Sequence, residues 1–86
     1  MTVRVERSFR GISERLTVRY LENLGGERID DDTVEGEGWT ARFHGETVTI
    51  GPSLTLTEVT VVFEGDADVL DDLIPEFAQK AMRAGG

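Results

Sequence analysis

The first ten residues alternate between apolar and polar side chains with a period of two. Val3, Val5 and Phe9 occupy one phase, and charged or hydroxyl side chains occupy the other. This period predicts a strand with one buried face. Arg7 falls in the inward phase, where a charge needs a carboxylate partner or an anion. An internal ion pair is the favoured interpretation.

The period changes to that of a helix after Gly11. Ser13 can cap the helix, because its side-chain oxygen can accept a bond from a free backbone N–H group. Gly25-Gly26 is expected to end it, since glycine readily adopts the left-handed conformation that follows many helices. The apolar side chains that share one helical face are Ile12, Leu16, Tyr20, Leu21 and Leu24.

Between residues 27 and 50 the period returns to two. Short strands are predicted on either side of the acidic turn 30–32, and another from Trp39 to Phe43. His44-Gly45-Glu46 has the composition of a tight turn, so a further strand is expected at residues 47–50.

The last strand is predicted from Leu54 to Phe63, after a turn at residues 51–53. Its apolar phase shifts between Leu56 and Val59. The shift indicates either a bulge near Thr57-Glu58 or burial on both faces.

A final amphipathic helix is predicted after Gly65, with Asp66 as its cap. Pro75 lies inside it, so a kink is expected, or a second start with the proline in the first turn. The apolar stripe of this helix comprises Val69, Leu70, Leu73, Ile74, Phe77, Ala81 and Met82.

These elements predict an α+β fold in a single domain, residues 1–86. Their order is strand, helix, three or four antiparallel strands, helix. Because each helix has one apolar stripe, both are expected to pack on one side of a curved antiparallel sheet.

The charge of the chain indicates the kind of solvent to which the protein is suited. Seventeen acidic residues face nine basic ones, the net charge is −8, and Lys80 is the single lysine. This composition resembles that of proteins from salt-accumulating halophiles, whose acidic surfaces keep them soluble.

We predict that the protein loses structure at low ionic strength. Salt screens the self-repulsion of a net −8 chain over a few ångströms. The melting temperature should therefore rise between low and molar salt. A melting temperature that stays flat over this range would contradict the prediction.

Several classes of protein are excluded or disfavoured. The chain has no cysteine, which excludes disulfides, thiolate metal sites and cysteine nucleophiles. No apolar run approaches the roughly 20 residues of a membrane span, and the N-terminus does not resemble a secretory signal. We therefore expect a soluble, cytoplasmic protein.

The basic residues are concentrated near the N-terminus, where residues 1–20 hold five arginines against two glutamates. Pairing with nearby acids is the favoured interpretation of this asymmetry. The alternative is a surface that binds a partner or an anion, although the net charge disfavours nucleic acid. The arginines of this candidate surface are Arg4, Arg10, Arg15 and Arg19.

No catalytic, metal-binding or cofactor-binding set is predicted. His44 is the only histidine and is expected to be a solvated turn residue. The acidic turn 30–32 lacks the spacing of a calcium loop. Trp39 is expected in the core; together with Arg7 it is the alternative candidate for the edge of a ligand pocket.

Three segments, residues 5–11, 20–26 and 59–66, support a family resemblance. Together with the element order they resemble the C-terminal domain of proteins related to the small sulfur-carrier subunit of molybdopterin synthase. The resemblance implies a fold of the TATA-binding-protein type. The chain would be a stand-alone, haloarchaeal-type version of that domain. It implies no established activity. It suggests a non-enzymatic accessory or binding domain, with a protein of the sulfur-carrier or adenylating pathway as partner.

The sequence ends in Gly85-Gly86, which leaves two interpretations. The diglycine can mark the end of the last helix. Alternatively, it can be activated at Gly86, as in ubiquitin-like carriers and modifiers. The first is favoured, because the diglycine of such carriers follows a strand, whereas here it follows a predicted helix.

Overall fold

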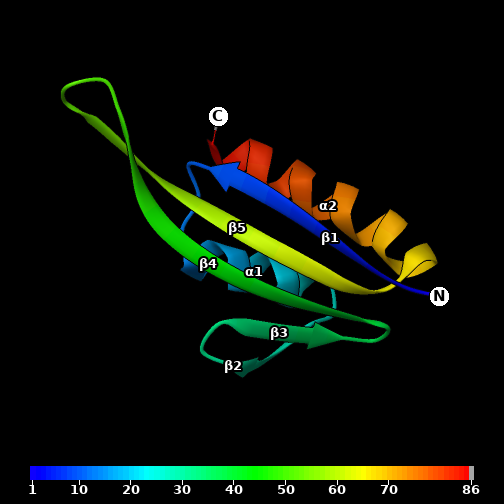
Figure 1. Ribbon diagram of the computed structural model, residues 1–86. Helices are drawn as coiled ribbons and strands as arrows, with labels where there is room; N and C mark the ends of the chain where they lie inside the picture. The colour runs from blue at the N-terminus through cyan, green and yellow to red at the C-terminus, as the bar shows by residue number, and fades with distance from the viewer. Residues whose placement is uncertain (86) are drawn as a thin grey trace.

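The chain folds into one five-stranded sheet with two helices, in a computed structural model that describes residues 1–85 (Figure 1). Four strands follow the first helix, so the predicted element order is confirmed. The elements are β1 (Thr2–Arg10), α1 (Glu14–Asn23), β2 (Glu27–Asp30), β3 (Thr33–Gly36), β4 (Trp39–Ile50), β5 (Leu54–Asp66) and α2 (Ala67–Gly85).

The strand order is β1-β5-β4-β3-β2, and every neighbouring pair is antiparallel. The strands from β2 to β5 form a meander. The last strand then lies between β4 and the first strand, which forms one edge of the sheet.

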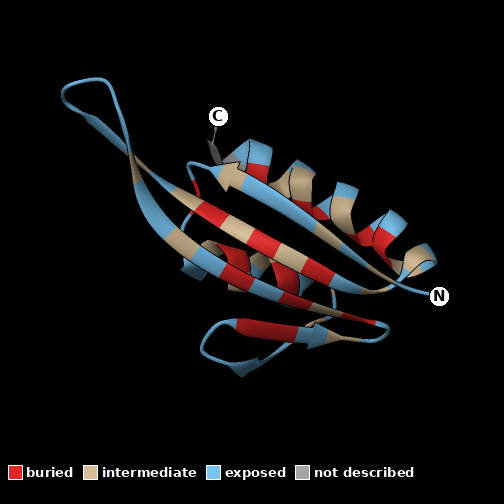
Figure 2. Cartoon of the chain, in the orientation of Figure 1, coloured by how far each residue is buried: buried red, intermediate tan, exposed pale blue. Residues whose placement is uncertain are grey.

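Both helices pack on the same face of the sheet, as the sequence predicts. Helix α1 contacts β2, β3 and β4, whereas α2 contacts β1 and β5. Figure 2 shows the buried residues alternating along β4 and β5, which is the pattern of a sheet with one covered face. The buried apolar core comprises Ile12, Leu21, Val34, Trp39, Ala41, Phe43, Val59, Val61, Phe63, Leu70, Leu73, Phe77 and Ala81.

The predicted ends of α1 are confirmed. The Ser13 hydroxyl accepts a hydrogen bond from the Leu16 N–H at 3.1 Å. At the other end, Gly25 has a φ of 97°, and the Gly26 N–H donates to the Leu21 carbonyl at 2.9 Å. The first glycine pair therefore ends a helix.

The turn predicted at His44-Gly45-Glu46 is wrong, because β4 runs through these residues to Ile50. Gly45 serves a different purpose. Its N–H donates to the Glu14 carboxylate at 2.8 Å, and a Cβ at this position would lie 2.8 Å from Glu14 Cγ. The glycine thus lets the start of α1 approach the strand.

The bulge predicted near Thr57-Glu58 is also wrong. Strand β5 pairs with β1 and β4 in unbroken registers. Burial on both faces is not the explanation either, because Leu54 is 53% exposed. The apolar phase shifts because Leu54 and Leu56 lie on the face of the sheet that no helix covers.

One continuous helix spans α2 with Pro75 inside it, so the proline does not start a second helix. Asp66 acts at its N-terminus as predicted, accepting a bond from the Asp68 N–H at 3.0 Å. The apolar stripe is shorter than expected. Ala81 is buried, but Met82 is 76% exposed.

Candidate functional site

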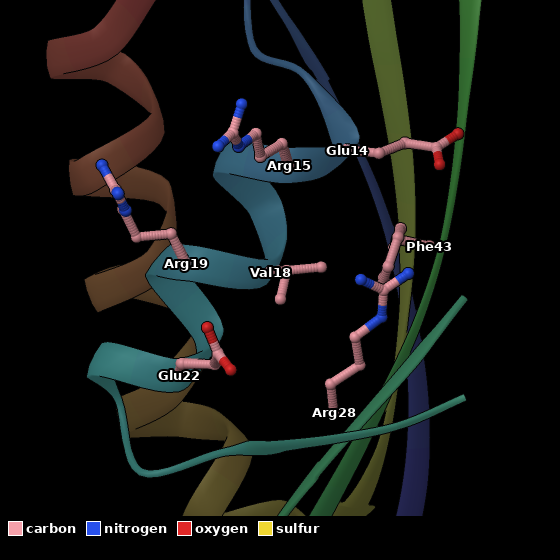
Figure 3. Close-up of a pocket in the computed structure, with 7 residues that line it drawn as sticks. All are labelled: Glu14, Arg15, Val18, Arg19, Glu22, Arg28 and Phe43. Carbon is pink, nitrogen blue, oxygen red and sulfur yellow. The ribbon is translucent and has the colours of Figure 1, made fainter. Parts of the chain in front are cut away.

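A groove of about 390 Å³ lies between α1 and the β2–β4 half of the sheet. Figure 3 shows α1 on one side of it and the strands on the other. Val18 and the buried ring of Phe43 provide apolar surface, and the rest of the lining is charged. The charged residues that line this groove are Glu14, Arg15, Arg19, Glu22 and Arg28.

Helix α1 supplies two of the three arginines. Arg15 and Arg19 are four residues apart and therefore lie on the same side of the helix. Both are exposed. In Figure 3 their side chains extend from α1 on the side away from Phe43, so they do not point toward Arg28.

Strand β2 supplies the third arginine, Arg28, which reaches across the groove toward Phe43 (Figure 3). Its guanidinium donates to the backbone carbonyls of Asp30 and Asp31, at 3.1 and 2.9 Å. These bonds hold the side chain in place and leave the acidic side chains of the turn free of it. Arg28 was not predicted as a site residue.

Glu14 holds one end of the groove in place. Its hydrogen bond to the Gly45 N–H fixes the first turn of α1 against β4. That contact sets the separation between the helix and the sheet at one end of the groove. The adjoining arginines are thus positioned on regular elements rather than on loops.

The structure does not bring the four predicted arginines together on one surface. Arg15 and Arg19 line the groove, but Arg4 and Arg10 lie on β1 and point to the helix-free face. Arg10 forms an ion pair with Glu58 at 2.9 Å. Within residues 1–85 this is the only ion pair, so the expected general pairing of arginines with nearby acids is wrong.

The internal ion pair expected for Arg7 is wrong as well. Arg7 is exposed and, in the described part of the chain, forms no ion pair. Its position at the edge of the sheet leaves it beside Ile74 and Pro75 of α2, where it lines two shallow hollows. Trp39 is 5% exposed in the core and lines none of the hollows described.

A second hollow, of about 460 Å³, collects acidic residues around the only histidine. Asp31 and Asp32 line it together with Glu14 and His44. Among residues 1–85, however, no three acidic or histidine side chains are arranged to hold a metal ion.

The C-terminal Gly85-Gly86 pair lies only partly within the described residues. Helix α2 runs through Gly85, and Gly86 lies outside the described residues. In residues 1–85 no helix is long and apolar enough to cross a membrane.

The fold and the groove define the class of protein: a two-layer α+β domain with both helices on one face of an antiparallel sheet. The chain belongs to the family of archaeal MoaD-like proteins, whose family model matches residues 5–86. The match confirms the relation to the sulfur-carrier subunit that the sequence resemblance indicated. A search of curated proteins found no match.

Proposed function

We propose that this chain is a non-enzymatic binding domain that acts with a sulfur-carrier protein or with the enzyme that activates one. The family match supports the association with sulfur carriers. The proposed docking site is the groove beside α1, and its binding partner is an anionic group such as a terminal carboxylate.

One observation carries the proposal. Three arginines from two elements, Arg15, Arg19 and Arg28, line one groove in a chain of net charge −8. None of them forms an ion pair within residues 1–85. Guanidinium groups bind carboxylates in bidentate fashion, and this geometry provides direction as well as attraction. Three arginines against Glu14 and Glu22 give the groove a formal charge of +1 on a protein of net charge −8, which favours an acidic partner at this place.

We predict that the double substitution Arg15→Glu/Arg19→Glu weakens capture of a sulfur-carrier protein at least tenfold. Both residues are exposed, so the fold should be retained. The measurement is isothermal titration calorimetry with a diglycine-ended carrier from the same host, at two salt concentrations.

The matched control is Arg4→Glu/Arg10→Glu, which changes the net charge equally but alters the helix-free face. It should leave the dissociation constant within about twofold of the starting protein. Equal loss in both variants would show that total charge, not the groove, governs capture. Unchanged binding in Arg15→Glu/Arg19→Glu would remove the groove from consideration.

A second candidate function is that of a carrier activated at Gly86. The terminal Gly85-Gly86 and the family match favour it. The helical position of Gly85 disfavours it, because an activating enzyme needs an extended tail. Intact mass spectrometry of protein from its host would detect a thiocarboxylate by the replacement of one oxygen with sulfur. Deletion of both glycines should abolish that species and leave the fold intact.

A further inference from the structure

The hairpin that joins β4 and β5 carries the longest uncharged segment of the chain. Residues 47–57 contain no charged side chain, although 30% of all residues are charged. The next longest uncharged segment is the buried part of β5, residues 59–63. The absence of charge at residues 47–57 cannot be explained in this way, because much of the segment is exposed.

This segment, called the arm below, extends beyond the rest of the sheet. Its two strands pair with each other, but β1 pairs with β5 only as far as Glu58, and β3 pairs with β4 only as far as Arg42. Figure 1 shows the arm projecting away from both helices. It is a two-stranded ribbon, a form that is marginally stable when nothing covers it.

The two faces of the arm differ in chemistry. Directly opposed pairs on one face are all threonine, and those on the other are all aliphatic. Because Phe43 and Val59 face the helices, the alternation of the strands places the aliphatic pairs on the helix-free face. The threonine pairs are Thr47–Thr57 and Thr49–Thr55, and the aliphatic pairs are Val48–Leu56 and Ile50–Leu54.

The aliphatic face is accessible. Leu54 is 53% exposed and Ile50 is 37% exposed, and both helices lie on the opposite side of the sheet. Figure 2 shows the end of the arm almost entirely exposed. The face thus offers apolar surface that a partner can remove from water.

We propose that this face is the contact between two copies of the chain, with the arms packed aliphatic face to aliphatic face about a two-fold axis. The net charge of the chain is the reason for proposing a second copy, rather than another protein, as the partner. Two copies each carry a net charge of −8 and repel one another wherever their acidic surfaces meet. A contact between copies therefore needs a surface free of carboxylates, and the aliphatic face of the arm is such a surface as far as the Glu46–Glu58 pair, which lies beside Val48–Leu56 on the same face.

A partner of opposite charge would have no such requirement. Acidic side chains around an apolar contact would attract a basic partner and speed its association. A two-fold contact also closes on itself, so that it yields a dimer rather than a filament. The aliphatic face of the arm is on the side of the sheet opposite α1, so the proposed contact does not depend on the function proposed for the groove.

The size of the arm sets the expected strength. Four aliphatic side chains per copy are far fewer than the roughly 20–30 residues on each side of a standard interface. The dimer is therefore weak and reversible. It should strengthen with salt, because salt screens the repulsion between the two acidic bodies but leaves the apolar contact in place.

Sedimentation velocity over a concentration series tests the proposal, from the lowest salt at which circular dichroism shows the folded chain to molar salt. The dimer fraction should rise with both protein and salt concentration. Leu54→Asp should weaken dimerisation at least tenfold. Leu54→Lys should weaken it too, although it reduces the net charge, because the contact is apolar.

The matched control is Ile29→Asp, which adds the same charge at a residue of similar exposure, 55%, on β2. It should dimerise nearly as well as the starting protein. A chain that sediments as a monomer under all conditions would overturn the proposal. So would equal loss in Ile29→Asp and Leu54→Asp, or stronger dimerisation in Leu54→Lys.

Discussion

Replacing Phe77 with alanine is expected to destabilise the fold by about 3–5 kcal/mol, the usual cost of removing a buried aromatic ring. A domain of this length has a total stability of roughly 4–13 kcal/mol. The substitution therefore removes a large share of the free energy of unfolding. Partial unfolding is expected at low salt, where repulsion between the acidic residues adds to the loss.

The reason lies in the place that Phe77 occupies. The side chain is fully buried in α2, and its ring meets three others edge to face. Phe9 lies 5.0 Å away, Phe63 lies 5.8 Å away and Tyr20 lies 6.1 Å away, measured between ring centroids. These partners belong to β1, β5 and α1. One ring thus connects both helices to β1 and β5, which pair with each other in the sheet.

Urea denaturation in molar salt measures the effect. The midpoint should fall sharply for Phe77→Ala and less for Phe77→Leu, which fills part of the volume. Met82→Ala, on the same helix, is the matched control. Because Met82 is 76% exposed, its loss should change stability by no more than about 0.5 kcal/mol. Similar midpoints for Phe77→Ala and Met82→Ala would contradict the packing described.

The sequence predicts those features of the fold that depend on near neighbours. The cap at Ser13 and the glycine end of α1 are local chemistry, and both are found. The alternation of Trp39, Ala41 and Phe43 predicts a strand with one buried face, as observed. Periodicity suffices for such elements because each residue's environment repeats along its own strand or helix.

The features that failed depend on contacts between distant segments. His44-Gly45-Glu46 resembles a turn locally, but the glycine is there to admit Glu14 from α1. Likewise, no local pattern reveals that Arg28 on β2 shares a groove with Arg15 on α1. Only the return of the chain after Gly25 brings them together.

The predicted arginine surface failed for a similar reason. Arg10 and Arg15 are close in sequence, and the strand and helix that carry them are adjacent elements. The alternation of β1, however, points Arg4 and Arg10 away from the helices, so that only the α1 pair reaches the groove. Half of the predicted surface therefore lies on the groove, and the other half lies on the opposite face of the sheet.

Replacing Gly36 with alanine is the second substitution for which a large loss is expected. A Cβ on Gly36 would collide with the indole ring of Trp39, the residue that pairs with Gly36 on the neighbouring strand β4. The same ring comes within 2.6 Å of a Cβ built on Gly26. Gly26, in the connection between α1 and β2, and Gly36, in β3, thus provide the space in which the indole packs. Overfilling this space should cost about 1–3 kcal/mol.

A double-mutant cycle separates this collision from any other effect of the substitution. In the Trp39→Leu background the obstructing ring is gone, so Gly36→Ala should cost at least 1 kcal/mol less than in the starting protein. Urea denaturation supplies all four free energies.

Gly51→Ala is the control for the cycle. Gly51 has a φ of 73° and nothing within 4 Å of a built Cβ, so its cost comes from the backbone alone. That cost should be the same in both backgrounds. If the cost of Gly36→Ala were also the same in both, Trp39 would not be the side chain that requires the glycine. A strong coupling would instead show that the indole of Trp39 packs β3 against β4 and α1. The arginine groove would then remain as the candidate for binding.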